Sequence, residues 1–218
     1  MTSMSAMPHE GVSNADRAYE IILERIMMLT IRPGDPINDE QVGTELGFGR
    51  TPVREALKRL ERDRLVVSYP RRGTFATAVD LTDLADISEI RTELEPLAAA
   101  RAARTANAER RAELRTLATH IADMPDSDPL AALGNDVQVH RAIYRASGNP
   151  YLEDVLIGLD AHATRIWCMF LGSLPRVSDH VHEHVPLLEA IIDGDARTAE
   201  RLALAHVAGF EKTIRAVL

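Results

Sequence analysis

Asp136 and His140 stand four residues apart on a predicted helix, and His184 and His206 fall on two later predicted helices. One carboxylate and three imidazoles form a donor set that suits a divalent ion such as Zn²⁺, Ni²⁺, Mn²⁺ or Fe²⁺. Four ligands carried by three helices can converge inside a helical bundle. The Asp-x-x-x-His spacing is equally that of an ordinary helical pair. The spacing alone therefore leaves both interpretations open.

A second group of residues points to nucleic acid. Arg50, Arg54 and Lys58 recur every four residues along one side of a helix that begins near Thr51. The hydroxyl of Thr51 is predicted to cap the first turn, where the missing N–H of Pro52 costs nothing. Another side of the helix is an apolar stripe, formed by Val53, Leu57 and Leu60. A helix of this kind suits insertion into a DNA groove, although a solvated amphipathic helix has the same pattern.

The charge distribution distinguishes the region of the basic helix from the rest of the chain. The whole chain carries a net charge of −8, which argues against a protein that binds nucleic acid over its entire surface. Residues 50–72 contain eight basic residues against three acidic ones (Glu55, Glu61 and Asp63), a local excess of +5. One basic patch on an acidic chain predicts a confined phosphate-binding surface.

The elements around the basic patch predict a small domain over residues 14–78, after a tail at residues 1–13. A helix from Asp16 ends at the breaker cluster 32–36, and a short second helix follows, capped by Asn38 or Asp39. The helix near Thr51 comes next. Two β-prone runs, Leu65–Tyr69 and Thr74–Val79, then flank Pro70-Arg71-Arg72-Gly73. Three helices and a basic hairpin in this order predict a winged helix-turn-helix.

Residues 79–218 show almost only helical patterns with short connections, which predicts an all-helical antiparallel bundle and a mainly α protein. Pro96 and Pro186 fall inside two of the expected helices and should kink them. The single cysteine, Cys168, lies in an apolar run and is predicted to be a buried, inert thiol. The expected helices are residues 81–105, 107–123, 128–147, 150–173, 178–193 and 195–216.

No segment has the length and apolar content of a signal peptide or a membrane span. The sequence therefore predicts a cytoplasmic protein with no membrane partner.

The N-terminal region resembles the GntR-type bacterial transcription regulators, and the whole chain after the tail resembles their FadR-like (FCD) branch. The resemblance rests on Ile31-Arg32-Pro33-Gly34, on the run Leu46 to Glu61, and on a hairpin that contains Gly73. Gly49 departs from the family, which usually has Ser or Thr there. Gln41 replaces an arginine that touches DNA in some relatives. The resemblance implies a ligand-responsive, sequence-specific DNA-binding regulator, a repressor, that acts as a homodimer on double-stranded operator DNA and is not an enzyme.

The resemblance also assigns roles to residues in both regions. In the winged domain it implies DNA contacts from the helix and from the hairpin, which gives the set Arg50, Thr51, Arg54, Lys58, Arg71, Arg72 and Gly73. In the bundle it implies that Asp136, His140, His184 and His206 bind a divalent metal ion, with a small organic acid as effector. His180 or His182 could replace His184. The expected effector contacts are Arg91, Asn149 and Arg165, although Arg91 could instead form a salt bridge to a bundle glutamate.

A different class of function remains as an alternative. Three histidines and an aspartate can also leave a coordination position open for an activated water. The bundle would then be a metal-dependent hydrolase or lyase fused to a nucleic-acid-binding module. Against this alternative, no further carboxylate stands out as a general base and no nucleophile motif is present.

Overall fold

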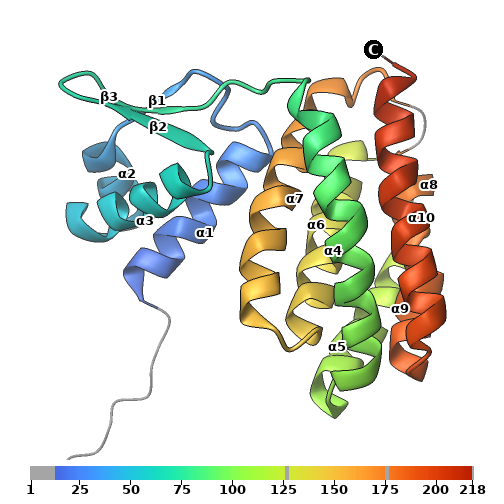
Figure 1. Cartoon of the computed structure of the whole chain (residues 1–218). Coiled ribbons are helices and arrows are strands. Elements are labelled where there is room, and N and C mark those ends of the chain that lie inside the picture. Colours follow the sequence, from blue (N-terminus) through green and yellow to red (C-terminus); the bar gives the residue numbers. More distant parts are fainter. Residues whose placement is uncertain (1–12, 126–127, 175–176, 218) are drawn as a thin grey trace, which may run out of the picture. The chain divides into compact units, whose positions relative to one another are not determined.

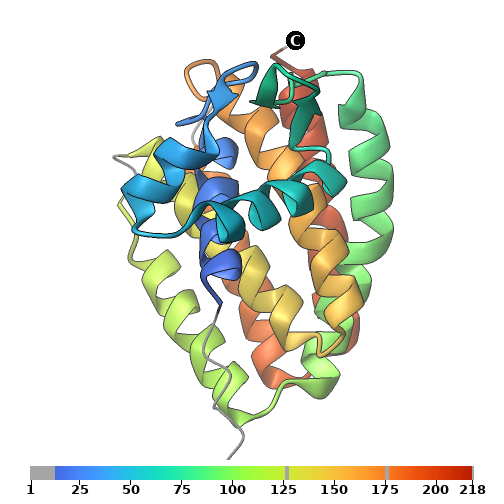
Figure 2. The ribbon, with the colours of Figure 1, turned by 90° about the vertical axis from the view of Figure 1, so that its left-hand side faces the viewer.

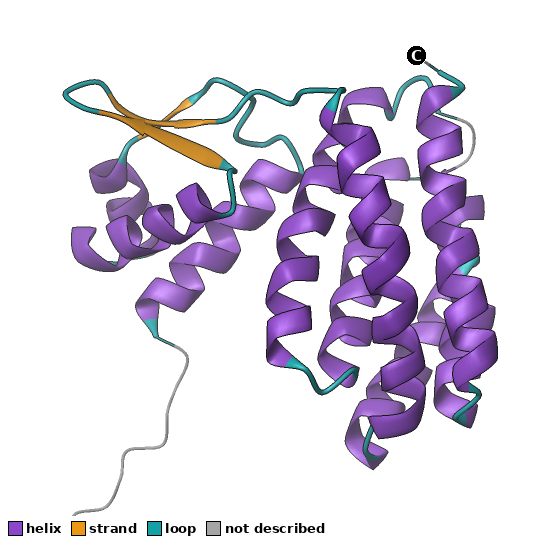
Figure 3. Cartoon of the chain, viewed as in Figure 1, coloured by secondary structure: helices purple, strands orange, loops and turns teal. Residues whose placement is uncertain are grey.

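The computed structural model describes residues 13–125, 128–174 and 177–217, and its contacts divide the chain into two compact units at Ala78 and Val79. The first unit contains three helices and a small sheet, whereas every described element of the second unit is a helix (Figure 1, Figure 3). The predicted class, a winged helix-turn-helix followed by a helical bundle, is confirmed.

In the first unit, α1 (Asn14–Met27) packs against α3 (Arg50–Arg62), which crosses in front of it in Figure 2. Ser13 caps α1 and forms a capping box with Asp16. Ser13 therefore belongs to this helix and not to the predicted tail, whose other residues lie outside the described ranges. The short α2 (Asp39–Leu46) is capped by Asn38, one of the two residues predicted for that position.

The start of α3 corrects one prediction. The helix begins at Arg50, its N-cap is Gly49, and no side chain caps it. Thr51 is the second helical residue, so its hydroxyl is already inside the helix and the predicted cap is wrong. Pro52 is the third helical residue, a position that has no intrahelical acceptor for an N–H, as expected. Val53, Leu57 and Leu60 are buried, as the apolar stripe predicted.

The sheet of the first unit has three antiparallel strands in the order β1-β3-β2. β2 (Val66–Tyr69) and β3 (Gly73–Ala76) form the predicted hairpin, in which Val66 faces Ala76 and Tyr69 faces Gly73. β3 ends at Ala76, three residues before the predicted end, because Ala76 is the last residue paired with β2. The two-residue strand β1 (Pro36–Ile37) was not predicted and pairs with the other side of β3.

The second unit is built around α4 (Asp83–Thr105), which packs against α6, α7, α9 and α10. Pro96 lies inside α4, as predicted. The side-chain oxygens of Asn107, Asp128, Asn149 and Asp195 accept hydrogen bonds from the first turns of α5, α6, α7 and α10, respectively. The remaining elements are α5 (Ala108–Ala122), α6 (Pro129–Ala146), α7 (Pro150–Phe170), α8 (Val177–His182), α9 (His184–Asp193) and α10 (Ala196–Arg215).

The helix predicted over 178–193 is wrong as a single element. It is divided into α8 and α9 by a break at Glu183. The break places Pro186 in the first turn of α9, where backbone N–H groups have no acceptor within the helix. Pro186 therefore costs no helical hydrogen bond and does not kink α9. The break also makes His184 the first residue of α9.

Cys168 is half-buried on α7, and burial raises the pKa of its thiol to about 11, which agrees with an inert thiol at neutral pH. Among the described residues, no helix has the length and apolar content needed to cross a membrane.

Candidate metal centre and nucleic-acid interface

Three helices of the second unit bring four potential metal ligands together. Asp136 and His140 come from α6, His184 from the start of α9 and His206 from α10. One ligand atom from each residue lies within 4.8 Å of those from the other three, and all four side chains are buried. The structure therefore assembles the whole set that the sequence predicted for a metal ion.

The distances within this cluster are short. Nε2 of His140 lies 3.3 Å from Nε2 of His206 and 3.7 Å from Oδ2 of Asp136. Nδ1 of His184 lies 3.6 Å from Oδ1 of Asp136. Two imidazole nitrogens and a carboxylate thus face one small volume, as ligands of a common ion would.

Two atoms of the cluster provide a test of whether an ion fits. Nε2 of His184 and Oδ1 of Asp136 are buried and have no hydrogen-bond partner in the described part of the chain. A buried polar atom left without a partner costs about 1–3 kcal/mol. Nδ1 of His184 lies 3.1 Å from the carbonyl oxygen of Val181, so a proton on Nδ1 leaves the Nε2 lone pair free. A divalent ion with nitrogen and oxygen ligands satisfies both atoms.

Carboxylates behind the cluster orient two of its imidazoles. Nδ1 of His140 lies 3.2 Å from Oε2 of Glu95, and Nδ1 of His206 lies 3.2 Å from Oε2 of Glu183. Each Nδ1–H donates to its carboxylate, which directs Nε2 of the same ring toward the centre of the cluster. Glu95 is held in turn by Arg91, whose Nε lies 2.5 Å from Oε1.

Burial and charge set the protonation of the cluster. Burial acts to lower the pKa of His140, but the carboxylates of Glu95 and Asp136 outweigh it and raise this pKa to about 9. Burial lowers the pKa of His184 to about 3 and the pKa of His206 well below its usual value. Glu95 remains ionised, because Arg91 and His140 outweigh its burial and hold its pKa below the ordinary range. At neutral pH, two imidazoles are therefore neutral and ready to bind a metal.

A cavity of about 10 Å³ adjoins the cluster, roughly the space of one water molecule. Nε1 of Trp167 is buried beside it and has no hydrogen-bond partner among the described residues. The cavity lining therefore includes Arg91 and a tryptophan whose indole donor has no partner among the described residues. It is lined by Arg91, Asp136, His140, Asp160, Ala163, Thr164, Trp167, His180, His206 and Phe210.

In the first unit, the predicted nucleic-acid residues are exposed on two elements. The side chains of Arg50 and Arg54 on α3 are 53% and 61% exposed, and Thr51 and Lys58 are exposed on the same helix. Arg71, Arg72 and Gly73 are exposed at the tip of the hairpin, where Arg71 (φ 64°) and Gly73 (φ 100°) adopt left-handed backbone. No side chain occupies Gly73, so a ligand can approach the backbone at the tip closely.

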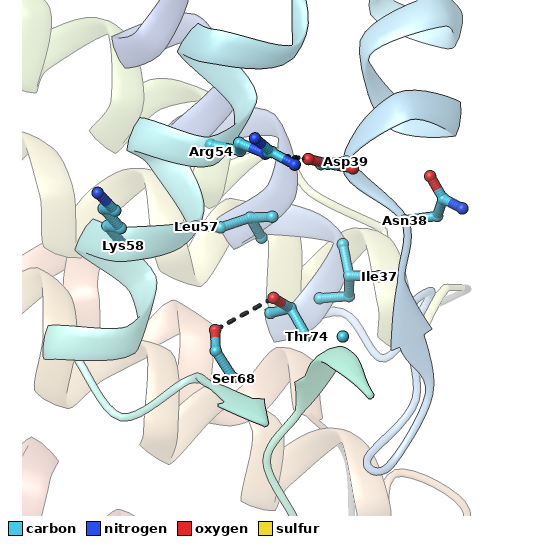
Figure 4. A pocket seen from close by; sticks show the side chains of 9 residues that line it. Ile37, Asn38, Asp39, Arg54, Leu57, Lys58, Ser68 and Thr74 are labelled. Atoms are coloured by element: carbon cyan, nitrogen blue, oxygen red, sulfur yellow. Dashed lines mark hydrogen bonds and ion pairs between the residues drawn. The ribbon is translucent and has the colours of Figure 1, made fainter. Parts of the chain in front are cut away.

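An aspartate that the sequence did not single out lies between these arginines. The carboxylate of Asp39, on α2, accepts hydrogen bonds from Arg54 Nε and, at 3.3 Å, from Arg50 Nη2. It thereby holds both guanidiniums on the exposed side of α3. A cleft of about 360 Å³ opens beside them, and Figure 4 shows Arg54 directed toward Asp39 and, on the hairpin, Ser68 hydrogen-bonded to Thr74.

Comparisons with known proteins identify the family of both units. Residues 14–76 match the model of the bacterial regulatory proteins of the gntR family, and residues 86–209 match the FCD domain. The chain belongs to the GntR family and carries an FCD domain. As a member of this family it is a transcription regulator and not an enzyme.

Relatives of this GntR regulator match along most of its length. It is 27% identical to a probable D-xylose utilization operon transcriptional repressor of Paenarthrobacter nicotinovorans, over 90% of this chain and 86% of that protein. It is 22% identical to the HTH-type transcriptional repressor RspR of Escherichia coli, over 91% and 88%, respectively. The solved structure of E. coli McbR/YncC has the same fold, with a TM-score of 0.80 at 21% identity over 94% of this chain and 99% of the other.

The predicted effector residues of the GntR regulator have different surroundings. Arg91 lines the cavity and also pairs with Glu95 and, at 3.5 Å, with Asp160, so the salt bridge considered from the sequence is present. Asn149 is not among the cavity residues and instead caps α7. Arg165 is buried on α7, also away from the cavity lining, and burial lowers its pKa to about 10. Of the three, only Arg91 is placed to meet a ligand in this cavity.

The structure also distinguishes the neighbouring histidines. His184 belongs to the four-ligand cluster, whereas His180 stacks on His206 at 4.0 Å and lies 4.4 Å from the Trp167 ring. His180 and His206 both approach the carboxylate of Glu183, at 3.4 and 3.2 Å. His182 is in neither group. His184 is thus placed as the predicted ligand, and His180 forms part of the cavity wall.

Sequence reasoning missed the residues that support the cluster, namely Glu95, Tyr144, Asp160, Trp167 and Glu183. Glu95 carried a usable signal, since it lies one helical turn after Arg91 and four residues is the spacing of a helical ion pair. Tyr144 lies one turn after His140 on the same helix and carried a similar signal. Asp160 and Trp167 carried none, because their contacts with Arg91 and His180 come from helices that are distant in sequence.

Proposed function

We propose that this GntR-family regulator is a metal-dependent repressor whose helical domain senses a small organic acid. The observation that carries the proposal is the buried Asp136, His140, His184 and His206 cluster, in which two polar atoms have no hydrogen-bond partner among the described residues. A divalent ion held by these four residues would act as a Lewis acid for an oxygen ligand. The names of two relatives as repressors support the sign of regulation.

The effector is a small carboxylate because of the charges that face the cavity. Arg91 provides a fixed guanidinium that can bind a carboxylate in a fork, and Trp167 Nε1 provides a further donor. Asp160 holds Arg91 at 3.5 Å, and burial raises the pKa of Asp160, so this pair is the weaker of the two that Arg91 makes. An incoming carboxylate can replace Asp160 at Arg91.

The size of the cavity requires movement on effector binding. About 10 Å³ does not admit a carboxylate and its carbon chain, so lining side chains must move. His180 is the lining residue on the six-residue helix α8, and its side chain reaches the surface at 11% exposure. Displacement of His180 from its stack on His206 opens the cavity next to the metal ligands.

The winged domain reads operator DNA as one half of a homodimer. Arg50, Thr51, Arg54 and Lys58 contact the major groove through α3, and Arg54 and Arg50 can each donate in a fork to a guanine. Arg71, Arg72 and Gly73 at the hairpin tip contact phosphates or the minor groove. A single recognition helix reads only a short half-site, so two copies are needed on a palindromic operator.

Elemental analysis and the single tryptophan test the metal site. Dialysis against Zn²⁺ should leave one ion per chain in the wild type and none in the His184→Ala/His206→Ala double variant. Because Trp167 lies at the cavity, Ni²⁺ should quench its fluorescence in the wild type only. His120→Ala is the matched control, since His120 is an exposed histidine that pairs with Asn135. A wild type that retains no ion after loading contradicts the proposal.

The alternative of a metal-dependent hydrolase or lyase is not favoured, because the relatives and the fold are those of transcription regulators. The carboxylates behind the cluster are also engaged: Glu95 with Arg91 and His140, and Asp160 with Arg91. Metal-loaded protein should therefore not turn over generic ester or phosphate substrates.

A further inference from the structure

The cavity beside the metal cluster approaches the surface of the second unit at His180. Of the described residues that line this cavity, all except His180 are buried. The side chain of His180 is 11% exposed, whereas those of His184 and His206 are 0% and 4% exposed. A divalent ion in water carries a shell of water molecules, and the cavity of about 10 Å³ admits roughly one. An ion must therefore lose most of this water before it reaches the cluster, and protein ligands that replace the water lower the cost.

A second group of three potential metal ligands lies at this point. His180, Glu183 and His206 each offer one ligand atom within 4.8 Å of the other two. Nδ1 of His180 lies 3.4 Å from Oε2 of Glu183, and Nδ1 of His206 lies 3.2 Å from the same oxygen. The two imidazole rings are stacked, with 4.0 Å between their centroids and 23° between their planes. Two imidazole nitrogens and one carboxylate form a ligand set that Zn²⁺ uses when it keeps a further position open for water.

The exposure of these three side chains decreases from the solvent toward the buried cluster. Glu183 is 52% exposed, His180 11% and His206 4%. The break between α8 and α9 produces the outer end of this series, because it places Glu183 outside both helices. The next residue, His184, is fully buried in the four-ligand cluster. Two consecutive residues thus belong to an outer and an inner group of ligands.

His206 belongs to both groups, through different ring nitrogens. Its Nε2 lies 3.3 Å from Nε2 of His140 in the buried cluster, and its Nδ1 faces Glu183. A neutral imidazole carries a proton on one nitrogen and offers the lone pair of the other. The tautomer protonated on Nδ1 therefore serves the buried cluster, and the tautomer protonated on Nε2 serves the outer group. A neutral His206 can complete only one of the two groups at a time.

We propose that His180, Glu183 and Nδ1 of His206 form an outer divalent-cation site, which binds the ion as it enters and transfers it to the buried cluster. The exposed carboxylate of Glu183 attracts the cation from solution. On transfer, the ion leaves Nδ1 of His206, which takes up a proton, and binds Nε2, which gives one up. The outer site offers three ligands and the cluster four, so one ion per chain comes to rest in the cluster. The inference rests on the metal site of the proposed function and adds the path by which the ion reaches it.

The rate of metal loading tests the outer site. Metal-free protein is mixed with Ni²⁺ in a stopped-flow instrument, and the fluorescence of Trp167, whose ring lies 4.4 Å from that of His180, reports binding. His180→Ala should slow loading about tenfold, the lower end of what a lost partner costs at a metal site. The final content should remain one ion per chain.

The sign of this effect separates a ligand from a plug. If His180 only closed the cavity, its removal would open the path and speed loading. His182→Ala is the matched control, since His182 lies on the same helix and belongs to neither ligand group. Loading of His180→Ala that is as fast as in the wild type, or faster, overturns the proposal.

A variant without two of the buried ligands tests the outer site at equilibrium. Asp136→Asn/His184→Ala keeps all three outer ligands, so it should still bind one Zn²⁺ per chain, more weakly than the wild type, in calorimetry. Adding His180→Ala should weaken this residual binding at least about tenfold, and adding His182→Ala should not. In the wild-type background, His180→Ala should leave the Zn²⁺ affinity unchanged. Far-UV circular dichroism verifies that each variant is folded. Residual binding that does not depend on His180, or its absence in the folded double variant, overturns the outer site.

Failure of the outer site is distinguishable from failure of the buried one. A wild type that retains one Zn²⁺ per chain and loads no more slowly after His180→Ala overturns the outer site and leaves the buried site standing. Equal, weak Zn²⁺ affinities in the wild type and in Asp136→Asn/His184→Ala, both reduced by His180→Ala, support the outer site and contradict the buried one.

Discussion

The two proposed sites of this regulator use charge in opposite ways. The side chains of Arg50 and Arg54 on α3 are more than half exposed, and Asp39 orients them beside a cleft that is open to solvent. The histidines of the metal cluster, His140, His184 and His206, are almost completely buried. Glu95 and Glu183 orient His140 and His206 beside a cavity of about 10 Å³. In both places an acidic side chain from a neighbouring element fixes the direction of a nitrogen ligand or donor.

The difference in burial predicts how each site responds to its surroundings. Exposed arginines that bind DNA phosphates release the counterions of the DNA into the solvent. The affinity for DNA should therefore depend strongly on salt concentration. Buried imidazoles exchange protons for a metal ion, so their binding should depend on pH and little on salt. The following predictions therefore measure metal binding at the buried site and DNA binding at the exposed site separately.

The largest effect is expected for loss of a buried ligand. His184→Ala should weaken Zn²⁺ binding by at least about 1,000-fold, because even residues behind the ligands typically contribute 10- to 100-fold. Isothermal titration calorimetry measures the loss, and His120→Ala should leave the affinity as in the wild type. Binding of metal-free protein to DNA should not change. A His184→Ala variant with wild-type Zn²⁺ affinity would show that this cluster is not the metal-binding site.

The next effect concerns the exposed site. Arg54→Ala should weaken binding to an operator duplex selected from random sequences by roughly 10- to 100-fold, the value of one forked contact to a guanine. Arg62→Ala, an exposed arginine in the last turn of the same helix, should have little effect. Fluorescence anisotropy at several salt concentrations gives both the affinity and the slope. Equal losses of DNA affinity in the two variants would mean that Arg54 contributes only its positive charge and no specific contact to a base.

A smaller effect is expected behind the metal ligands. Glu95→Gln keeps an oxygen acceptor for His140 but removes the charge, so Zn²⁺ affinity should fall about tenfold. Glu113→Gln, in which a partly exposed glutamate of α5 is replaced, is the control. Calorimetry of the two folded variants makes the comparison. If Glu95→Gln binds Zn²⁺ as the wild type does, then Glu95 serves only the packing of Arg91.

The last prediction concerns the pH dependence of metal binding. His140 has a pKa raised to about 9 in the metal-free protein, so at neutral pH it must lose a proton before it binds a metal. Zn²⁺ affinity should therefore rise by up to about tenfold per pH unit from pH 7 to 8 and level off above 9. His184 and His206, with lowered pKa values, should add no proton release in this range. Calorimetry in buffers of different ionisation enthalpy measures the released proton, and its absence at pH 7 would contradict the raised pKa.

The sequence predicted those features that depend on local pattern. The stripe of Val53, Leu57 and Leu60 fixed the buried side of α3, and the spacing of Asp136 and His140 placed both on one side of α6. The positions of His184 and His206 came from the resemblance to a family, since nothing in their spacing shows that α9 and α10 meet α6.

The features that the sequence did not show depend on tertiary contacts. β1 is two residues long and is defined only by its pairing with β3, so no hydrophobic periodicity in the sequence could predict it. The break at Glu183 is absent from the hydrophobic pattern, which continues from α8 into α9. Arg91 illustrates the same limit: the pattern identified a cation on α4, and only the fold showed that it is already paired with Glu95 and Asp160.

The central claim is that the buried site controls the exposed one, and one measurement tests it directly. The affinity of Zn²⁺-loaded protein for its operator is measured with and without a small carboxylate that quenches Trp167 fluorescence. The carboxylate should weaken operator binding about 5- to 150-fold in the wild type, the usual range of such coupling, and should not weaken it in His184→Ala. A carboxylate that binds at Trp167 without changing operator affinity would contradict the claim.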